Sequence, residues 1–245
     1  MAFFRCDVMS ESLGMATSVL VTMPDTGDLA AAPVVYLLHG LTDNCTGWLR
    51  YTQAEHLART HGAILIVPEV QRSLYTDMAC GPKYFTYINQ KLPTLCRRFF
   101  GIQPVPERTY IMGLSMGGYG AMKCAFTAPQ QYAGCAGFSS VAEIQAELPQ
   151  LCRWHEDQAI FPHGIVPPQD DLFDLVEKFR DGTCPMPRLF LACGQQDSLY
   201  PANLRLRDTL QAMNWPLTWY EAPGDHNWFF WNDALGRAMK ELLEN

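Results

Sequence analysis

The sequence has no cluster of basic residues and no long apolar run. Its 245 residues carry a formal net charge of −7, and no run of basic residues exceeds the pair Arg97 and Arg98. A polyanion binder makes many more phosphate contacts than two residues supply, so the composition excludes nucleic acid as a partner. No stretch approaches the ~18 uninterrupted apolar residues of a transmembrane helix, so we also expect no membrane partner.

Processing and disulfide signals are lacking as well. The first seven residues alternate like a strand and show no basic region followed by an apolar core, so we expect no signal peptide. The nine cysteines are odd in number, irregularly spaced and without a C-x-x-C pair for zinc or redox exchange. We therefore expect a reduced, cytoplasmic protein without metal or organic cofactor. Cys45 and Cys80 fall in loops, and the sequence leaves their roles open.

The stretch Gly113-Leu114-Ser115-Met116-Gly117 is the most informative feature that is present. It follows the apolar run Thr109–Met112 and precedes small residues that let a helix pack closely under a sheet. This order predicts a strand, a sharp turn that carries Ser115, and a helix. Small residues are needed two positions either side of the serine because the backbone turns tightly there. Such a turn exposes the hydroxyl, which is typical of a serine nucleophile.

A serine hydroxyl is a weak nucleophile at neutral pH, so it requires a base and a group that orients the base. In hydrolases with this turn, the partners follow in the order Ser, Asp or Glu, His, each in a loop after a strand. Asp197 follows the apolar strand 187–193, and His226 follows the alternating strand 216–221. We therefore predict Ser115 as the nucleophile, Asp197 as the acid and His226 as the base.

The competing acids and histidines have simpler explanations. Asp225 is adjacent to His226, and neighbouring side chains on a loop rarely point the same way. Three acids resemble the start of a helix, where carboxylates are favoured: Asp170, Asp171 and Asp174. Four histidines suit surface, loop or helix-end positions: His56, His61, His155 and His163.

The loop after the strand Val34–Leu38 has a different predicted role. In hydrolases of this kind, that loop donates one backbone N–H to the oxyanion, and the residue after the nucleophile donates another. Leu41 and Met116 are the corresponding donors. His39, which precedes Gly40, is expected to shape the loop by hydrogen bonding and not to act in catalysis.

Four segments together resemble the esterase D group of α/β hydrolases, and the likeness runs over nearly the whole chain. They are His39-Gly40-Leu41-Thr42, Tyr75-Thr76-Asp77-Met78, the stretch 113–120 and Asp225-His226-Asn227-Trp228. The chain is most similar to the tributyrin and acetyl esterases and their feruloyl esterase relatives. The resemblance implies the same triad of Ser115, Asp197 and His226, with Leu41 and Met116 as the oxyanion hole.

The S-formylglutathione hydrolases belong to the same broad group, but this chain departs from them. Those proteins are somewhat longer and carry a cysteine soon after the His-Gly-Leu-Thr segment. Here Asp43 and Asn44 follow that segment, and Cys45 comes only afterwards. The departure weakens the thioesterase interpretation without removing it.

Strands and helices alternate along the chain, which predicts a mainly parallel sheet with helices on both faces. We expect a single α/β-hydrolase domain over residues 1–245, with a small helical cap inserted at about residues 140–186. The eight expected strands lie near residues 2–8, 15–23, 33–38, 63–67, 108–113, 133–138, 187–193 and 217–222.

These observations predict a serine carboxylesterase that hydrolyses short-chain acyl (acetyl or butyryl) or hydroxycinnamoyl esters through an acyl-enzyme. A small-molecule ester is the expected partner, and the sequence leaves a homo-oligomer open. Three aromatic residues beside the motifs are candidates for the substrate pocket: Trp48, Tyr75 and Trp228. The alternatives are an S-formylglutathione thioesterase, an acyltransferase with the same triad, and a non-catalytic interaction protein on this scaffold.

A histidine base predicts that activity falls in acid. The base must be neutral to accept the serine proton, and an ordinary imidazole has a pKa of about 6.5. We therefore expect kcat/KM for a short ester to fall as the pH drops through that value, with circular dichroism reporting the folded state at each pH. Undiminished activity at about pH 4.5 in a folded protein would contradict the assignment.

Overall fold

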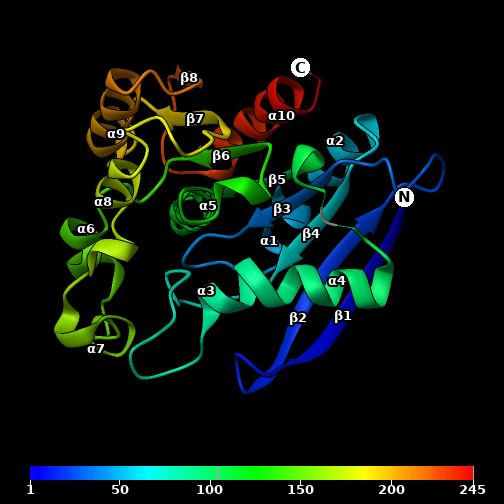
Figure 1. Cartoon of the computed structure of the whole chain (residues 1–245), viewed down its shortest axis with the longest axis horizontal. Helices are drawn as coiled ribbons and strands as arrows, with labels where there is room; N and C mark the ends of the chain where they lie inside the picture. The colour runs from blue at the N-terminus through cyan, green and yellow to red at the C-terminus, as the bar shows by residue number, and fades with distance from the viewer. Residues whose placement is uncertain (104, 245) are drawn as a thin grey trace.

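A computed structural model describes residues 1–103 and 105–244 and shows an eight-stranded sheet with helices on both faces (Figure 1). Each strand agrees with its predicted range to within two residues at either end. The strands are β1 (Ala2–Ser10), β2 (Met15–Met23), β3 (Val34–Leu38), β4 (Ile64–Pro68), β5 (Thr109–Leu114), β6 (Gly134–Phe138), β7 (Arg188–Gly194) and β8 (Leu217–Ala222).

The sheet has the order β1-β2-β4-β3-β5-β6-β7-β8. β2 is antiparallel to both β1 and β4, and the pairs from β4 to β8 are parallel. β3 and β4 are buried along their full length, because helices cover both faces of the sheet there. Their sequences, VVYLL and ILIVP, show the continuous apolar run that such strands require.

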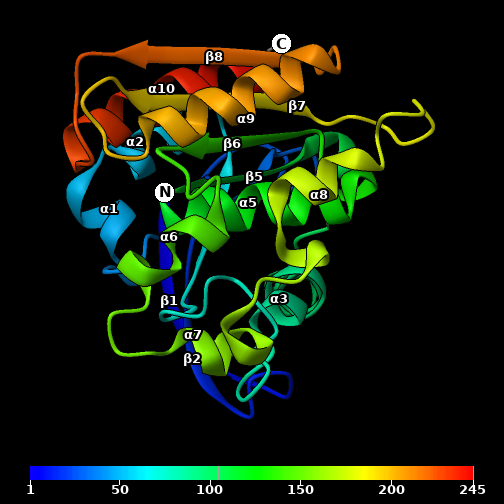
Figure 2. The same ribbon diagram turned by 90° about the vertical axis from the view of Figure 1, so that its left-hand side faces the viewer.

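Helices form a layer on each side of the sheet (Figures 1 and 2). α1, α2 and α10 pack on one face, and the other helices bury their apolar residues on the opposite side. The α-helices are α1 (Gly47–Tyr51), α2 (Ala54–Thr60), α3 (Tyr84–Thr86), α4 (Leu92–Phe100), α5 (Met116–Thr127), α6 (Ile144–Leu151), α7 (Asp157–Ile160), α8 (Leu172–Glu177), α9 (Tyr200–Ala212) and α10 (Trp228–Glu244). One π-helix, η1 (Tyr87–Lys91), joins α3 to α4, and the 3₁₀ turns are η2 (Pro106–Arg108), η3 (Pro129–Gln131), η4 (Pro162–Gly164) and η5 (Pro168–Asp170).

The segment between β6 and β7 holds the short helices α6, α7 and α8. Asp171 is the N-cap of α8 and accepts hydrogen bonds from two backbone N–H groups at its start. Asp170 has a different role, because its carboxylate pairs with the buried ammonium of Lys123 on α5. Tyr119, also on α5, donates its hydroxyl to the Asp170 carbonyl at 2.6 Å. These contacts fasten the segment to α5.

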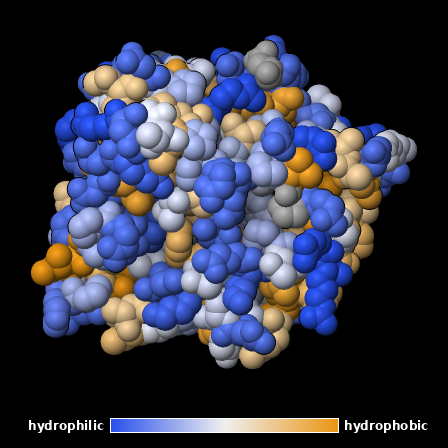
Figure 3. Space-filling model, in the orientation of Figure 1, coloured by the Kyte–Doolittle hydropathy of each residue, from blue (hydrophilic) through white to orange (hydrophobic). Residues whose placement is uncertain are grey.

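The surface is mixed in character. Figure 3 shows a largely hydrophilic face on which apolar residues occur in small, scattered groups. None of the helices within residues 1–103 and 105–244 is long and apolar enough to cross a membrane.

α5 is buried along nearly all its length, and its glycines permit this close packing. A Cβ at Gly120 would lie 2.4 Å from the ring of Tyr75, which is closer than packed atoms can approach. Gly236, in the middle of α10, is different, because a Cβ there would meet Leu57 at an ordinary 3.7 Å. Gly120 and Gly236 therefore form a matched pair for a test, because both lie in helices but only Gly120 lacks room for a methyl group.

We predict that Gly120→Ala destabilises the protein by about 1–3 kcal/mol, since the methyl group must displace the Tyr75 ring. Gly236→Ala is expected to be neutral or stabilising by up to about 1 kcal/mol, because alanine favours the helix. The free energy of unfolding, measured by urea titration, checks both values. Equal effects of the two substitutions would refute this explanation of Gly120.

Candidate active site

Four parallel strands bring the predicted site residues to one edge of the sheet. The loop with Leu41 follows β3, Ser115 follows β5, Asp197 follows β7 and His226 follows β8. Since β3, β5, β7 and β8 run parallel, their carboxyl ends lie along the same edge. Segments far apart in the sequence therefore meet here.

Ser115 occupies a strained turn between β5 and α5. Its backbone has φ 53° and ψ −116°, a conformation that non-glycine residues rarely adopt. The turn is tight because Gly113 and Gly117 approach other backbone atoms closely. A Cβ at Gly113 would lie 2.3 Å from the Gly117 carbonyl oxygen, and one at Gly117 would lie 2.3 Å from the carbonyl oxygen of Leu38. The structure thus has the predicted strand, turn and helix.

The side chains of Ser115, His226 and Asp197 form a hydrogen-bonded chain. Nε2 of His226 lies 3.0 Å from Oγ of Ser115, and Nδ1 lies 2.8 Å from Oδ2 of Asp197. The Asp197 side chain is fully buried, whereas the His226 side chain is 33% exposed. Asp225 does not compete for the ring, because its carboxylate accepts the backbone N–H of His226 at 2.7 Å. This is the geometry of a base that is oriented by an acid.

Other contacts hold Asp197 in its ionised form. Oδ1 of Asp197 accepts the backbone N–H of Leu199 at 2.9 Å. Ser139 accepts a hydrogen bond from Nε1 of Trp231 at 3.1 Å and also bonds to the Asp197 carboxylate. Burial raises the pKa of the Asp197 carboxyl, but the hydrogen bonds and charge of His226, with those of Ser139 and Leu199, lower it by more. Sequence reasoning missed Ser139 and Trp231, which no motif marks.

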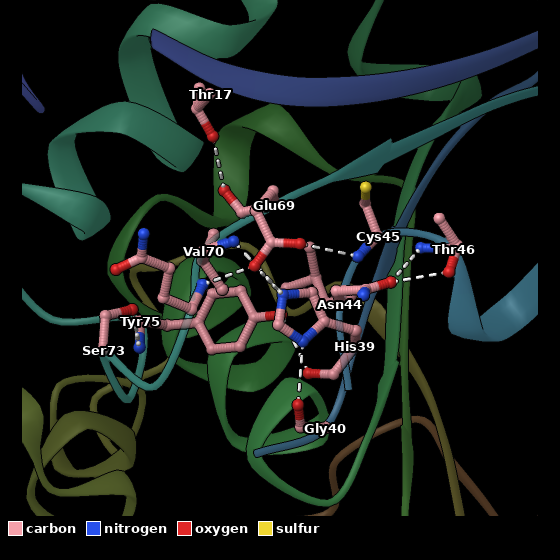
Figure 4. Close-up of polar contacts among 12 residues, drawn as sticks. Thr17, His39, Gly40, Asn44, Cys45, Thr46, Glu69, Val70, Ser73 and Tyr75 are labelled. Atoms are coloured by element: carbon pink, nitrogen blue, oxygen red, sulfur yellow. Dashed lines mark hydrogen bonds and ion pairs between the residues drawn. The ribbon is translucent and has the colours of Figure 1, made fainter. Parts of the chain in front are cut away.

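Two backbone N–H groups, those of Leu41 and Met116, are the predicted oxyanion donors. Met116 begins α5, so its N–H has no acceptor within the helix. Among the described residues, the Met116 N–H and the Leu41 N–H donate to no carbonyl group of a turn or loop. The Gly40 carbonyl, in the same peptide unit as the Leu41 N–H, accepts Nδ1–H of His39 at 2.8 Å (Figure 4). C=O and N–H of one peptide point in opposite directions, so the Leu41 N–H faces away from His39.

A cavity of about 370 Å³ opens at this hydrogen-bonded chain. Its walls are formed by Gly40, Leu41, Thr42, Asp43, Leu114, Ser115, Leu151, His226, Asn227, Trp228 and Trp231. Trp228 is thus on the wall, as the sequence predicts for a pocket residue. Burial raises the pKa of the Asp43 carboxyl, although His39, the Gly40 N–H and His226 act against this. Asp43 is the acidic side chain of the wall.

Trp48 and Tyr75 require a correction, because the structure places neither of them on the wall of the cavity. Both are fully buried. Nε1 of Trp48 donates to the Leu38 carbonyl at 2.9 Å, and the ring packs edge-on against Trp228. The hydroxyl of Tyr75 donates to the His39 carbonyl at 3.0 Å. These residues support the loop after β3 from behind and lie outside the cavity.

Cys45, in the loop after β3, does not supply a nucleophile to the site. Burial, with the neighbouring Glu69 carboxylate, raises the pKa of the Cys45 thiol to about 12, so it stays protonated at neutral pH. Cys80 is exposed, and its backbone N–H donates to the Ala159 carbonyl at 2.9 Å. Among residues 1–103 and 105–244, no group of three or more His, Cys, Asp or Glu side chains has the arrangement of a metal site.

Glu69 lies beneath the loop after β3, and sequence reasoning missed it. Its carboxylate accepts the backbone N–H groups of Cys45 at 2.9 Å and Gln71 at 2.8 Å. Oε1 also lies 3.5 Å from Nε2 of His39 (Figure 4). Burial raises the pKa of Glu69, but His39 and the two N–H groups lower it by more, to about 2.

The fold and the Ser–His–Asp arrangement define a serine hydrolase with the α/β-hydrolase fold. The chain belongs to the Esterase family, whose model matches residues 10–176. It is 26% identical over 259 residues to an acetyl esterase from Caldicellulosiruptor saccharolyticus, and the match covers 98% of this chain and 97% of that protein. The predicted resemblance to carboxylic ester hydrolases is therefore confirmed.

Solved structures of serine hydrolases superimpose over the whole chain. FphF, a fluorophosphonate-binding serine hydrolase from Staphylococcus aureus, has a TM-score of 0.90 and 30% identity, covering 100% of this chain and 99% of FphF. The S-formylglutathione hydrolase FrmB from the same organism has a TM-score of 0.89 and 30% identity, covering 99% and 98%. A ferulic acid esterase, at 19% identity and a TM-score of 0.81, covers 99% and 98% and shows the same fold.

We predict that Glu69→Gln loses stability in a pH-dependent way. The folded-state pKa of about 2 lies below the ordinary 4.5, so the stabilisation is present above pH 4.5 and is lost as the pH falls toward 2. The variant should therefore lose about 2 kcal/mol at neutral pH and progressively less in acid. Urea unfolding of both proteins between neutral pH and about pH 4 measures the difference. A difference that does not change with pH would contradict the assignment.

Proposed function

We propose that this protein is a serine carboxylesterase for short acyl esters, in which Ser115 is the nucleophile, His226 the base and Asp197 the orienting acid. The observation that carries the proposal is the pair of contacts on one imidazole ring, 3.0 Å to Oγ of Ser115 and 2.8 Å to the Asp197 carboxylate. Leu41 and Met116 supply the oxyanion N–H groups.

The proposed reaction proceeds in two steps. His226 takes the hydroxyl proton as Oγ of Ser115 attacks the ester carbonyl, and the carbonyl oxygen becomes an oxyanion beside the Leu41 and Met116 N–H groups. The tetrahedral intermediate collapses, His226 returns the proton to the departing alcohol, and an acyl-enzyme remains. Water, deprotonated by His226, then attacks the acyl group, and His226 returns the proton to Oγ of Ser115 as the acid departs. Asp197 stabilises the imidazolium that forms in each step.

The preference for a small acyl group rests on two observations. The wall of the cavity beside Ser115 includes the bulky side chains of Trp228 and Trp231. The similarity to an acetyl esterase extends over 98% of this chain. For hydroxycinnamoyl esters, the likeness to a ferulic acid esterase at 19% identity concerns the fold alone.

A second candidate function is thioester hydrolysis on S-formylglutathione. The 30% identity to FrmB, over 99% of this chain, favours it. A bovine S-formylglutathione hydrolase is 26% identical, but that match covers only 55% of this chain. The same Ser115, His226 and Asp197 would serve both reactions, so only the substrates can distinguish them. Acyl transfer to an alcohol would also use these three residues. It is distinguished from hydrolysis by adding an alcohol acceptor and analysing the products for the new ester.

The decisive test compares kcat/KM for p-nitrophenyl acetate, p-nitrophenyl butyrate, methyl ferulate and S-formylglutathione, with Ser115→Ala as the blank. We expect the short oxygen esters to be preferred and the variant to lose at least about 10⁴-fold in kcat, as for other triad nucleophiles. A preference for S-formylglutathione would replace the proposal by its alternative. Full activity of Ser115→Ala would refute both.

A further inference from the structure

The orientation of the Leu41 N–H depends on three preceding carbonyl groups, each of which is held by a side chain. The Leu38 carbonyl accepts Nε1 of Trp48 at 2.9 Å, and the His39 carbonyl accepts the Tyr75 hydroxyl at 3.0 Å. The Gly40 carbonyl accepts Nδ1 of His39 at 2.8 Å. We call residues 39–45 the oxyanion loop. The backbone that leads into this loop is therefore held by side chains at three successive carbonyl groups.

Glu69 joins this loop to the sheet. It directly follows β4, and its backbone N–H donates to the Ser18 carbonyl at 3.0 Å while its carbonyl accepts the Thr17 hydroxyl at 3.2 Å. Both partners lie on β2, so the main chain of Glu69 is anchored to β2 as well as to β4, which it directly follows. Figure 4 shows the side chain extending from this anchor toward Cys45 and His39.

The carboxylate lies against the oxyanion loop at both of its ends. Oε2 accepts the Cys45 N–H at 2.9 Å at the far end of the loop, and Oε1 lies 3.5 Å from Nε2 of His39 at its start. Nε2 also accepts the Val70 N–H at 3.2 Å. A ring nitrogen that accepts an N–H carries no proton, so the Val70 contact leaves the ring proton on Nδ1. Nδ1–H therefore donates to the Gly40 carbonyl, which fixes the orientation of the peptide that carries the Leu41 N–H.

The same carboxylate also holds a strained segment behind the loop. Gln71, Leu74 and Tyr75 have positive φ values of 52°, 50° and 49°, and such conformations persist only where the surroundings impose them. Oε1 of Glu69 accepts the Gln71 N–H at 2.8 Å at the start of this segment. Nζ of Lys123 binds the Tyr75 carbonyl at 3.2 Å at its end. Tyr75 is thereby placed to bind the His39 carbonyl.

We propose that Glu69 is a positioning residue for the oxyanion hole. Its carboxylate connects the oxyanion loop, through Cys45 and His39, to the strained segment 71–75, and so aims the Leu41 N–H at the carbonyl oxygen of the substrate. The inference rests on the proposed function, since an oxyanion arises only in acyl transfer. It assigns no contact between Glu69 and substrate.

The test is Glu69→Gln, which keeps the shape of the side chain. An amide has one acceptor oxygen in place of two, so it cannot accept the N–H groups of Cys45 and Gln71 in the same geometry. Loss of an oxyanion donor costs about 10²–10³ in kcat, so a misaligned donor should cost roughly tenfold or more. KM for p-nitrophenyl acetate should change less than about threefold, because the contact strengthens in the transition state. The Ki of a trifluoromethyl ketone, which forms an oxyanion on the serine, should weaken by the same factor as kcat/KM falls.

Asp171→Ala is the matched control, because Asp171 also accepts two backbone N–H groups, at 2.8 and 3.3 Å, but at the start of α8. We expect it to lower the Tm and to leave kcat and the ketone Ki unchanged. Should Glu69→Gln fail to fold, Thr17→Val loosens the same anchor without altering the carboxylate and should lower kcat with KM unchanged.

Three results would overturn the proposal: a kcat of folded Glu69→Gln within twofold of the wild type, an equal loss of kcat in Asp171→Ala, or a loss confined to KM. Each would reduce Glu69 to a stabilising residue or a ground-state contact. A wild-type protein without esterase activity would instead refute the proposed function, so the two failures are distinguishable.

Discussion

The active site depends on the close approach of Gly117 to the end of β3. Because Gly117 has no side chain, the first turn of α5 packs directly on the carbonyl groups of Leu38 and His39. This contact brings the N–H of Met116 and the loop that carries Leu41 to the same side of Ser115. A Cβ at Gly117 would lie 2.3 Å from the Leu38 oxygen and would force the two segments apart. The proposed nucleophile and oxyanion hole therefore depend on the same backbone contact.

Charged groups around the site are buried or half-buried, and each has partners that offset the cost of leaving water. Asp197 is held by His226 and the Leu199 N–H, and Glu69 by two backbone N–H groups. Lys123 pairs with Asp170 and lies 4.9 Å from the centre of the Phe85 ring. Burial without such partners would cost several kcal/mol per charge, or would neutralise the group. The rigid polar network beneath the loops keeps the donors preorganised, which is what stabilisation of an oxyanion requires.

The sequence predicted the sheet and the Ser115, His226 and Asp197 contacts because both follow from local patterns. Apolar strands mark the sheet, and parallel strands bring the residues after them to one edge. The sequence placed Trp48 and Tyr75 wrongly in the pocket, because proximity in the chain to a motif does not reveal which way a ring points. Both rings point inward and bind backbone carbonyls. Glu69 escaped notice for a related reason, since its partners lie on loops whose approach depends on tertiary packing.

The most direct test of the central claim is covalent labelling by a fluorophosphonate followed by peptide mapping. Phosphonylation requires an activated serine hydroxyl, and the product does not turn over, so the label records which residue is the nucleophile. We predict one label per chain, on the peptide that contains Ser115, with labelling much slower in Asp197→Asn because the imidazole loses its orienting acid. A label on any other residue, or none on the folded protein, would contradict the assignment of Ser115, His226 and Asp197.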